Sequence, residues 1–579
     1  MTQDPRPRCR PLKALSLISL SPVSLSLAAL LAALAQPGLA APGTLVLTNA
    51  RIHTVNPAAP TAEAIAISGD GIILAVGGKD AVLRAAGEGA EVTDLKGQMV
   101  LPGFQDAHMH LIEAGVNEAL CAFEPFDRLA DTLAAVRDCA DGTKEGWIVG
   151  SGVSMTNLLD QSDNPIDLLD KISPDRPILI LDDIGHGAWA NSAAMAAAGY
   201  DRMTSDPPGG ILLRDKATGK LNGVVLENAQ QRLRNLAFPG SPERVEFAYR
   251  AMLKTLKLMA ENGITTVSDA GGFWPQGHVK VWQRALAEGR LTVRASNALY
   301  VYPDMNFDQQ VADLKALYSN DHQSLLRFNQ AKIYVDGILE QRTGALLRPY
   351  RKGPGIDHGH DSGFLYFDPE TLDRYARTLS AAGFQLHFHV TGDRGARLAL
   401  DAIAQSDPAS GPHRLTHLYL VDRADIPRFA ALGAVADLQL APSSLDPEYN
   451  AFIRTFIGDR ADFMMPAASL EAAGALVTLS SDFDADELSP LVKIQTAVER
   501  RTEGARDVDT AIRWMTINPA KLLQQEKTTG SLEVGKFADL VVIDRDITAV
   551  PVGRIGTAEV VATLLQGKPV FDAEGLFAR

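Results

Sequence analysis

Residues 101–110 read LPGFQDAHMH, an apolar run that ends in two histidines. The run predicts a strand over Gln98–Gln105, and His108 and His110 follow it two positions apart. Side chains two positions apart on extended backbone face the same side, so both imidazoles can reach one metal ion. Two histidines near a strand end are more often ordinary surface residues, so the pair gains meaning only from the rest of the chain.

Seven further apolar, β-branched runs follow, and each precedes a stretch rich in Ala, Leu and Arg. Eight strands that alternate with helices favour a parallel sheet, and their number suits a closed (β/α)8 barrel, the TIM barrel, over residues 99–524. The predicted strands are Gln98–Gln105, Gly263–Asp269, Leu291–Val301, Phe328–Val335, Gln385–Val390, Arg414–Leu420, Ala434–Leu440 and Ala475–Ser481.

Two further regions are expected around the barrel. The long gap between the first and second strands predicts a subdomain inserted over about residues 113–255, which would shape the substrate mouth. Short alternating strands with tight turns occupy residues 44–98 and return over residues 525–575. We expect these two chain segments to form one small β-sandwich domain.

The N-terminal 40 residues have the layout of a secretory signal peptide. Basic residues between Arg6 and Lys13 precede an apolar run, and small residues allow cleavage after Ala40. An uncleaved membrane anchor is the alternative, but only about 12 strongly apolar residues are present where a span needs about 20. The mature protein is therefore expected to be periplasmic or secreted, without stable membrane association.

The amino-acid composition limits the kinds of molecule that this protein is expected to bind. The chain of 579 residues carries 55 basic and 70 acidic residues, a formal charge of −15 that argues against nucleic acid as a partner. A small-molecule substrate is expected, and a homo-oligomer is compatible with the sequence. Cys121 and Cys139 would remain after signal cleavage, and an oxidising compartment predicts a disulfide between them. Two buried thiols are the alternative.

Four more polar residues lie inside or at the ends of predicted strands: Lys332, His389, His417 and Asp482. An ammonium group within an apolar strand is costly, which makes Lys332 unusual. Carbamylation would make this side chain anionic and give it two oxygens able to bridge two metal ions. Barrel enzymes place their chemistry at the C-terminal ends of strands, where these residues are expected to meet.

With these motifs together, the chain resembles the amidohydrolase superfamily, and within it family 3, which includes N-substituted formamide deformylase-like enzymes. The resemblance runs from about residue 44 to about residue 570. It rests on Leu101–His110, on Lys332 with the following Val335–Thr343, on His389–Arg394, on Ser481-Asp482 and on Gly530–Leu540.

The resemblance implies two divalent metal ions, zinc being the expected element. One ion would be held by His108, His110 and Asp482, and the second by His389 and His417. Lys332, carbamylated, would bridge them. This sequence departs from many relatives at Thr416, where they carry Glu, and in residues 338–341. Both departures weaken inferences about the substrate.

The expected reaction is hydrolysis of carbon–nitrogen bonds other than peptide bonds, in amide or N-formyl-like substrates, by a metal-bridging hydroxide with Asp482 as general base. His186, Glu227 and Arg342 are weaker candidates for substrate binding, with loop hydrogen bonds or salt bridges as the alternative. His387 is expected to be a packed or supporting residue. A lactonase or other ester hydrolase, a deaminase on the same barrel and a catalytically inactive binding protein are the alternatives.

Overall fold

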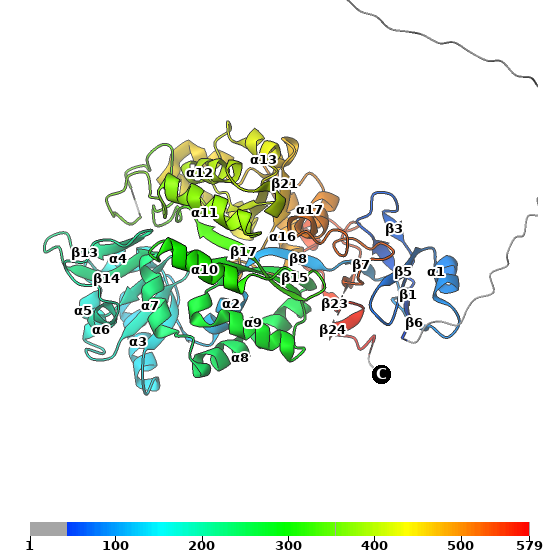
Figure 1. Ribbon diagram of the computed structural model, residues 1–579, viewed down its shortest axis with the longest axis horizontal. Coiled ribbons are helices and arrows are strands. Elements are labelled where there is room, and N and C mark those ends of the chain that lie inside the picture. The colour runs from blue at the N-terminus through cyan, green and yellow to red at the C-terminus, as the bar shows by residue number, and fades with distance from the viewer. Residues whose placement is uncertain (1–42, 354, 578–579) are drawn as a thin grey trace, which may run out of the picture.

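The computed structural model describes residues 43–353 and 355–577. The expected signal peptide, residues 1–40, lies outside the described residues. Three regions follow one another along the long axis of the molecule (Figure 1): a lobe with its own sheet, a central barrel, and small sheets at the other end. Within the described residues, no helix combines the length and apolarity that a membrane span needs.

The central barrel is an eight-stranded sheet in which all neighbouring strands are parallel. The first and last strands of this sheet also meet, which closes the barrel. They are joined by a hydrogen bond of 2.9 Å from the Asp482 amide, after the last strand, to the His108 carbonyl on the first. The predicted TIM barrel is therefore confirmed. In order, the strands are β8 (Phe104–Met109), β15 (Ile264–Gly272), β16 (Arg294–Tyr300), β17 (Leu326–Tyr334), β18 (Gln385–Val390), β19 (Arg414–His417), β20 (Val435–Leu438) and β21 (Leu476–Leu479).

Two small sheets lie beside the barrel, and the second of them combines strands from both ends of the chain, as expected. One contains β5 (Ile73–Gly77), β4 (Ala64–Ile67), β1 (Leu45–Thr48) and β6 (Glu91–Asp94). The other contains β24 (Lys568–Asp572), β23 (Val560–Leu565), β22 (Leu540–Ile543), β7 (Met99–Pro102), β2 (Arg51–His53) and β3 (Thr61–Ala62). A shared buried core that includes Leu47 and Ile65 from the first sheet and Leu540 from the second holds them together. Helix α1 (Lys79–Ala86) packs against the first sheet.

The first predicted strand, Gln98–Gln105, is wrong in its bounds because the chain changes sheets within it. β7 pairs with β2 and β22, whereas β8 pairs with β15. The Gly103 amide donates to the Asp539 carbonyl of the small sheet at 2.9 Å, and the next amide already donates to the barrel. A Cβ at Gly103 would lie 2.2 Å from the Thr265 hydroxyl oxygen, so only glycine fits this crossing point.

Helices surround the barrel, and local sequence signals set where they begin. Ser241 accepts a hydrogen bond from the Arg244 amide and is followed by proline, which starts α8. Asp368 starts α11 in the same way. The barrel helices are α2 (Leu111–Glu118), α8 (Pro242–Glu261), α9 (His278–Ala287), α10 (Phe307–Leu317), α11 (Pro369–Ala381), α12 (Asp393–Ala404), α13 (Ile426–Leu432), α14 (Pro447–Ile457), α15 (Ala467–Ala472), α16 (Pro490–Glu499), α17 (Val508–Trp514) and α18 (Ile517–Leu522).

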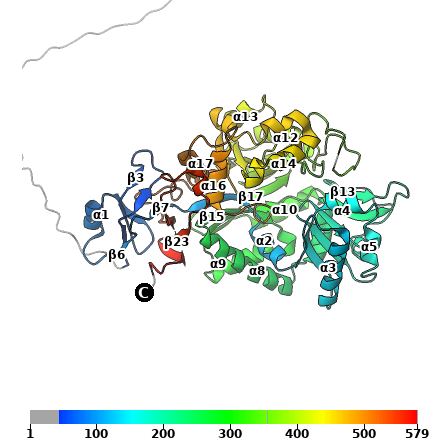
Figure 2. The ribbon, with the colours of Figure 1, turned by 180° about the vertical axis from the view of Figure 1, so that it is seen from behind.

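The inserted lobe, seen from behind in Figure 2, is built on a six-stranded sheet. Its strands are β13 (Gly210–Arg214), β14 (Leu221–Glu227), β12 (Gly187–Ala190), β11 (Ile178–Asp182), β10 (Ile148–Val153) and β9 (Cys121–Ala122). Its helices are α3 (Leu129–Gly142), α4 (Met155–Gln161), α5 (Ile166–Asp170), α6 (Ser192–Ala197) and α7 (Ala229–Ala237). A disulfide joins Cys121 on β9 to Cys139 on α3.

The insertion is shorter than the expected residues 113–255. Helices α2 and α8 overlap the two ends of that range, yet they pack on each other and against β15, which makes them part of the barrel. The lobe therefore leaves the barrel after α2 and returns before α8. This places its loops beside the ends of the first and second barrel strands, close to the predicted histidine pair.

Candidate metal centre

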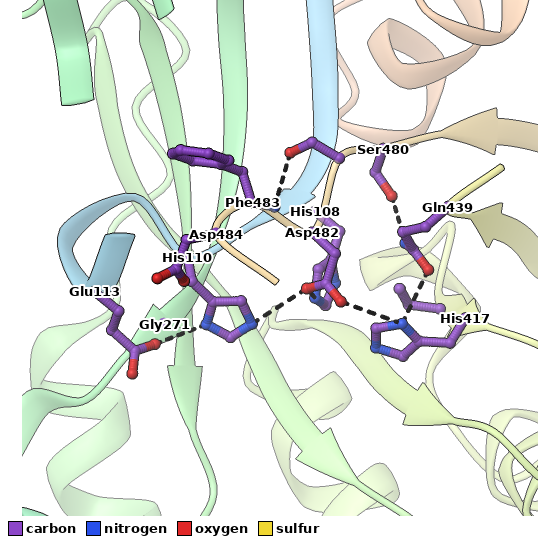
Figure 3. Close-up of polar contacts among 12 residues, drawn as sticks. His108, His110, Glu113, Gly271, His417, Gln439, Ser480, Asp482, Phe483 and Asp484 are labelled. Carbon is purple, nitrogen blue, oxygen red and sulfur yellow. Dashed lines mark hydrogen bonds and ion pairs between the residues drawn. The ribbon is translucent and has the colours of Figure 1, made fainter. Parts of the chain in front are cut away.

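Three side chains from the two adjoining edge strands of the barrel form a compact cluster. His108 lies on β8, His110 directly follows it, and Asp482 follows β21. Asp482 Oδ1 is 3.1 Å from His108 Nε2 and 3.6 Å from His110 Nε2. Figure 3 shows the Asp482 carboxylate between the rings of His110 and His417. One nitrogen or oxygen of each side chain lies within 4.8 Å of those of the other two, an arrangement that can hold a metal ion.

The remaining predicted ligands surround this cluster. Lys332 Nζ lies 3.3 Å from His108 Nε2, and His417 Nδ1 lies 3.7 Å from Asp482 Oδ2. The His417 ring centroid is 5.0 Å from that of His108 and 4.3 Å from that of His389. The structure thus brings all six predicted ligands to the C-terminal ends of the barrel strands, where parallel strands converge.

Each of the four histidines has at least one ring nitrogen in contact with a protein partner. The contacts are His108 Nδ1 to His387 Nε2 at 2.7 Å, His110 Nδ1 to Glu113 Oε2 at 2.7 Å, His417 Nδ1 to Gln439 Oε1 at 2.9 Å, and His389 Nε2 to the Gly337 carbonyl at 3.4 Å. Among the described residues, the second ring nitrogens of His389 and His417 are buried without a hydrogen-bond partner. Metal-binding histidines are typically oriented in this way by a partner at the other nitrogen.

Burial keeps most of these groups in the neutral form that binds metals. It lowers the pKa of His417 to about 3, although the Asp482 carboxylate acts in the opposite direction. Burial likewise lowers the pKa values of His108 and His389 well below the usual range and that of Lys332 to about 7. His110 differs: burial alone would lower its pKa, but the hydrogen bond and charge of Glu113 raise it.

The residues that orient the histidines were not identified from the sequence, apart from His387. Glu113 lies three residues after His110 in the first turn of α2, a spacing at which side chains on a helix meet. Burial alone would raise the pKa of Glu113, but the charge of Arg234, which contacts it, and the His110 hydrogen bond lower it to about 2. Gln439 directly follows β20. Its position at the end of a barrel strand was the one feature of the sequence that could have indicated its role.

A cavity that is partly open to solvent lies over the cluster. The insertion forms one wall through Asp182, Asp183 and His186, and barrel residues including His110, His389, His417 and Asp482 form the other. Of the weaker candidates, His186 therefore lines the cavity, and Glu227 lies behind it, 2.6 Å from its Nδ1. Arg342 instead packs over the Tyr350 ring and is not among the described residues that line this cavity.

Two residues that line the cavity and one behind it have a left-handed backbone conformation, which residues other than glycine rarely adopt. The φ angles are 57° at Asp482, 78° at His417 and 58° at Glu227. Such residues tend to occur at functional sites, where the surrounding structure enforces them. Asp482 and His417 each lie at the end of a barrel strand, where this backbone turns the side chain toward the cluster.

Comparison with known proteins places the chain in a family. It belongs to the amidohydrolase family, whose model matches residues 91–571. N-substituted formamide deformylase of Arthrobacter pascens is 28% identical over 562 residues, covering 92% of this chain and 99% of that protein. Protein LONG AFTER FAR-RED 3 of Arabidopsis thaliana is 27% identical over 551 residues, covering 91% of each chain.

A solved structure shares the fold over most of its length. A metal-dependent hydrolase from Pyrococcus horikoshii superposes with a TM-score of 0.69 at 21% identity, covering 88% of this chain and 99% of that chain. The family model confirms the predicted membership in the amidohydrolase group. The chain is a member of a family of metal-dependent hydrolases and has a candidate metal site of two histidines and an aspartate.

Proposed function

We propose that this protein hydrolyses carbon–nitrogen bonds other than peptide bonds, in small amide substrates such as N-formyl or N-acyl amines. The observation that carries the proposal is the convergence of four imidazoles, one carboxylate and one buried amine beneath a single cavity. The relationship to a formamide deformylase over nearly the whole chain supports this choice of bond.

The donor set fits two divalent ions, with zinc as the preferred element because of its imidazole and carboxylate ligands. In this proposal His108, His110 and Asp482 would hold one ion, His389 and His417 would hold the other, and Lys332, if carbamylated, would supply a ligand that both ions share. The free, buried ring nitrogens of His389 and His417 support this assignment. So does Lys332, a fully buried amine beside a histidine rather than a carboxylate. When bound, such ions acidify water and polarise a carbonyl group.

Asp482 is suited to move the proton. Its carboxylate lines the cavity and its two oxygens face His108 and His417. It accepts the proton of the attacking water and returns it to the departing nitrogen, as a general base and then a general acid. We also propose export to the periplasm or the exterior, which is supported by the first 40 residues of the sequence and by the disulfide.

A lactonase or ester hydrolase would use the same centre, so substrates must separate the alternatives. The test measures metal per chain in the purified protein and its turnover of N-formyl, N-acetyl, cyclic imide and lactone compounds. We expect about two ions per chain, fastest turnover of an N-formyl or N-acyl amide, loss of activity on chelation and its return with zinc. Fastest turnover of a lactone would replace the proposal, and a chain without metal or activity would indicate a binding protein.

Lys332→Met is the matched variant for the metal assignment. It retains an apolar stem of similar length but removes the nitrogen that carbamylation requires. We expect it to bind fewer ions than the wild-type protein and to lose activity. An unchanged metal content would contradict the bridging role of Lys332.

A further inference from the structure

A second cavity, also partly open to solvent, lies beside the first cavity over the candidate metal centre. The two adjoin, because His186, His389, His417 and Asp482 line both. The second cavity extends between the insertion and the loops that follow β17 and β19. A substrate whose scissile bond lies at the centre can therefore extend into it. The residues that line only the second of the two cavities are Ile338, Glu340, Thr391, Tyr419, Gln439 and Asp486.

Glu340 brings a carboxylate group to the second cavity. It lies in the loop after β17, within residues 338–341, where this sequence departs from many relatives. The Tyr449 hydroxyl on α14 donates a hydrogen bond to Glu340 Oε1 at 3.0 Å. Among the described residues, Glu340 has no ion pair and Oε2 has no hydrogen bond. One oxygen is therefore fixed, and the other is available to a ligand.

Burial makes this lone carboxylate unfavourable. It raises the pKa of Glu340, although the Tyr449 hydrogen bond and the His186 ring act in the opposite direction. His186 Nδ1 is itself 2.6 Å from Glu227 Oε2, so this ring already has an anionic partner. A cation that a ligand brings to Glu340 would therefore be bound strongly.

The other cationic side chains of the two cavities also have anionic partners. Asp486, the second carboxylate that lines only the second cavity, is 3.3 Å from Nζ of the fully buried Lys493. Arg234 is the one lysine or arginine among the described residues that line either cavity, and it forms an ion pair with Glu113. The protein thus supplies no cation of its own to Glu340.

The insertion adds two more carboxylates where the cavities meet. Asp182 ends β11, Asp183 follows it, and both line the first cavity. Asp182 is only 5% exposed; its Oδ1 has no hydrogen-bond partner among the described residues, and its Oδ2 accepts from Gln341 Nε2, next to Glu340, at 2.6 Å. Burial raises the pKa of Asp183 to about 6, and the charge of Glu340 acts in the same direction. Carboxylates gathered in this way favour a positively charged ligand.

We propose that the substrate carries an aliphatic ammonium group, which Glu340 binds in the second cavity while the scissile amide lies at the candidate centre. Asp183 strengthens this preference for a cation through its charge. Tyr419 adds an aromatic ring to the same cavity, and aromatic rings attract ammonium groups. The ammonium group takes no part in the reaction, so no bond to it forms or breaks. This inference rests on the proposed amide hydrolysis and names the class of its substrate.

The test compares amides that differ only by an ammonium group in place of a terminal methyl group. N-acetyl diamines with two to five methylene groups are compared with N-alkylacetamides of equal length, which places the charge on the amine side. Anilides of ω-amino acids are compared with fatty-acid anilides of equal length, which places it on the acyl side. We expect the wild-type protein to favour the charged member of at least one pair by about 10- to 100-fold in kcat/KM, the range for one hydrogen bond to a charged group.

Glu340→Gln removes the charge but keeps an oxygen that can accept from Tyr449. We expect the favoured ammonium substrate to lose about 10- to 100-fold in kcat/KM, mainly through KM, because a binding contact is lost. Its neutral counterpart should lose far less, so the ratio of the two falls toward one. Glu448→Gln, an exposed residue beside Tyr449 that lines neither cavity, is the matched control and should keep the preference. Metal content and the thermal midpoint are measured for each variant.

Each outcome gives a decision. Equal turnover of charged and neutral amides by the wild-type protein, or a preference that Glu340→Gln retains, would overturn the inference and leave amide hydrolysis in place. Equal losses on both members of a pair would also overturn it, and so would loss of a bound ion in Glu340→Gln, which would make this carboxylate a metal ligand. If the wild-type protein and Glu448→Gln hydrolyse none of the amides, charged or neutral, the proposed function fails and this inference fails with it.

Discussion

At the scale of single residues, Asp482 lies beside three of the other candidate ligands. Its carboxylate lies within 3.7 Å of nitrogens of His108, His110 and His417. Its amide also closes the barrel through His108. A carboxylate in this position can serve as both ligand and proton acceptor, so the two roles must be separated experimentally.

Asp482→Asn makes that separation. The amide keeps the shape and one oxygen of the side chain but can no longer accept a proton. We expect metal content close to wild type and a rate loss of about 10²-fold or more, the range for loss of a general base. Metal analysis and steady-state kinetics on the same preparation measure both quantities. Turnover near the wild-type rate would contradict the role as general base.

The candidate ligands could be predicted from the sequence because each one lies at or near the end of a strand. Their partners could not, because they depend on which strands meet. His387 contacts His108 only because β8 and β18 face each other across the barrel. Thr416, the departure from related sequences, places its hydroxyl 3.1 Å from His387 Nε2. This contact accounts structurally for a residue that the sequence pattern left unexplained.

At the scale of elements, alternating apolar patterns located the barrel strands but did not show which sheet a strand joins. β18 has its predicted bounds, whereas the run before His108 belongs to two sheets. The sequence stays apolar across Pro102 and Gly103 because the strands on both sides are buried. The pattern therefore does not show that the chain passes from one sheet to another at this point. The change of partner depends on the close approach of Gly103 to Thr265, a contact that no local pattern records.

The contact between β18 and β19 gives a prediction about pH. His413 is buried, accepts a hydrogen bond at Nδ1 from the Leu386 amide at 3.0 Å, and has a pKa that burial lowers to about 4. Between the ordinary value of 6.5 and about 4, the unfolded chain binds a proton that the folded chain does not. This residue therefore stabilises the fold fully above pH 6.5 and progressively less as the pH falls.

His413→Asn keeps an acceptor near the position of Nδ1 for the Leu386 amide but cannot be protonated. We expect the free energy of unfolding of the wild-type protein, relative to this variant, to fall by about 2 to 3 kcal/mol between pH 7 and pH 4.5. Urea unfolding of both proteins at several pH values measures the difference and cancels the contributions of other groups. A pH-independent difference would show that His413 has the same proton affinity in both states.

At the scale of the whole molecule, the candidate metal centre and the small sheets that brace the barrel lie at opposite ends of its strands. The candidate centre and the insertion lie at the C-terminal ends of the strands, and the small sheets join the N-terminal ends (Figure 1). The join includes a buried ion pair: Arg294, the first residue of β16, donates from Nε to Asp539 Oδ2 at 2.6 Å. Asp539 also accepts from the Gln566 amide at 2.7 Å.

Asp539→Ala should therefore destabilise the protein without affecting the reaction. Removing one partner leaves the Arg294 charge buried and unpaired, which costs about 3–5 kcal/mol. We expect a lower midpoint in urea, unchanged metal content, and wild-type kcat and KM under conditions where the protein stays folded. In the double variant Arg294→Met/Asp539→Leu, apolar side chains replace both charges, and part of the lost stability should return. A fall in kcat for folded Asp539→Ala would show that the small sheets influence the candidate metal centre, although that centre lies at the opposite end of the barrel strands.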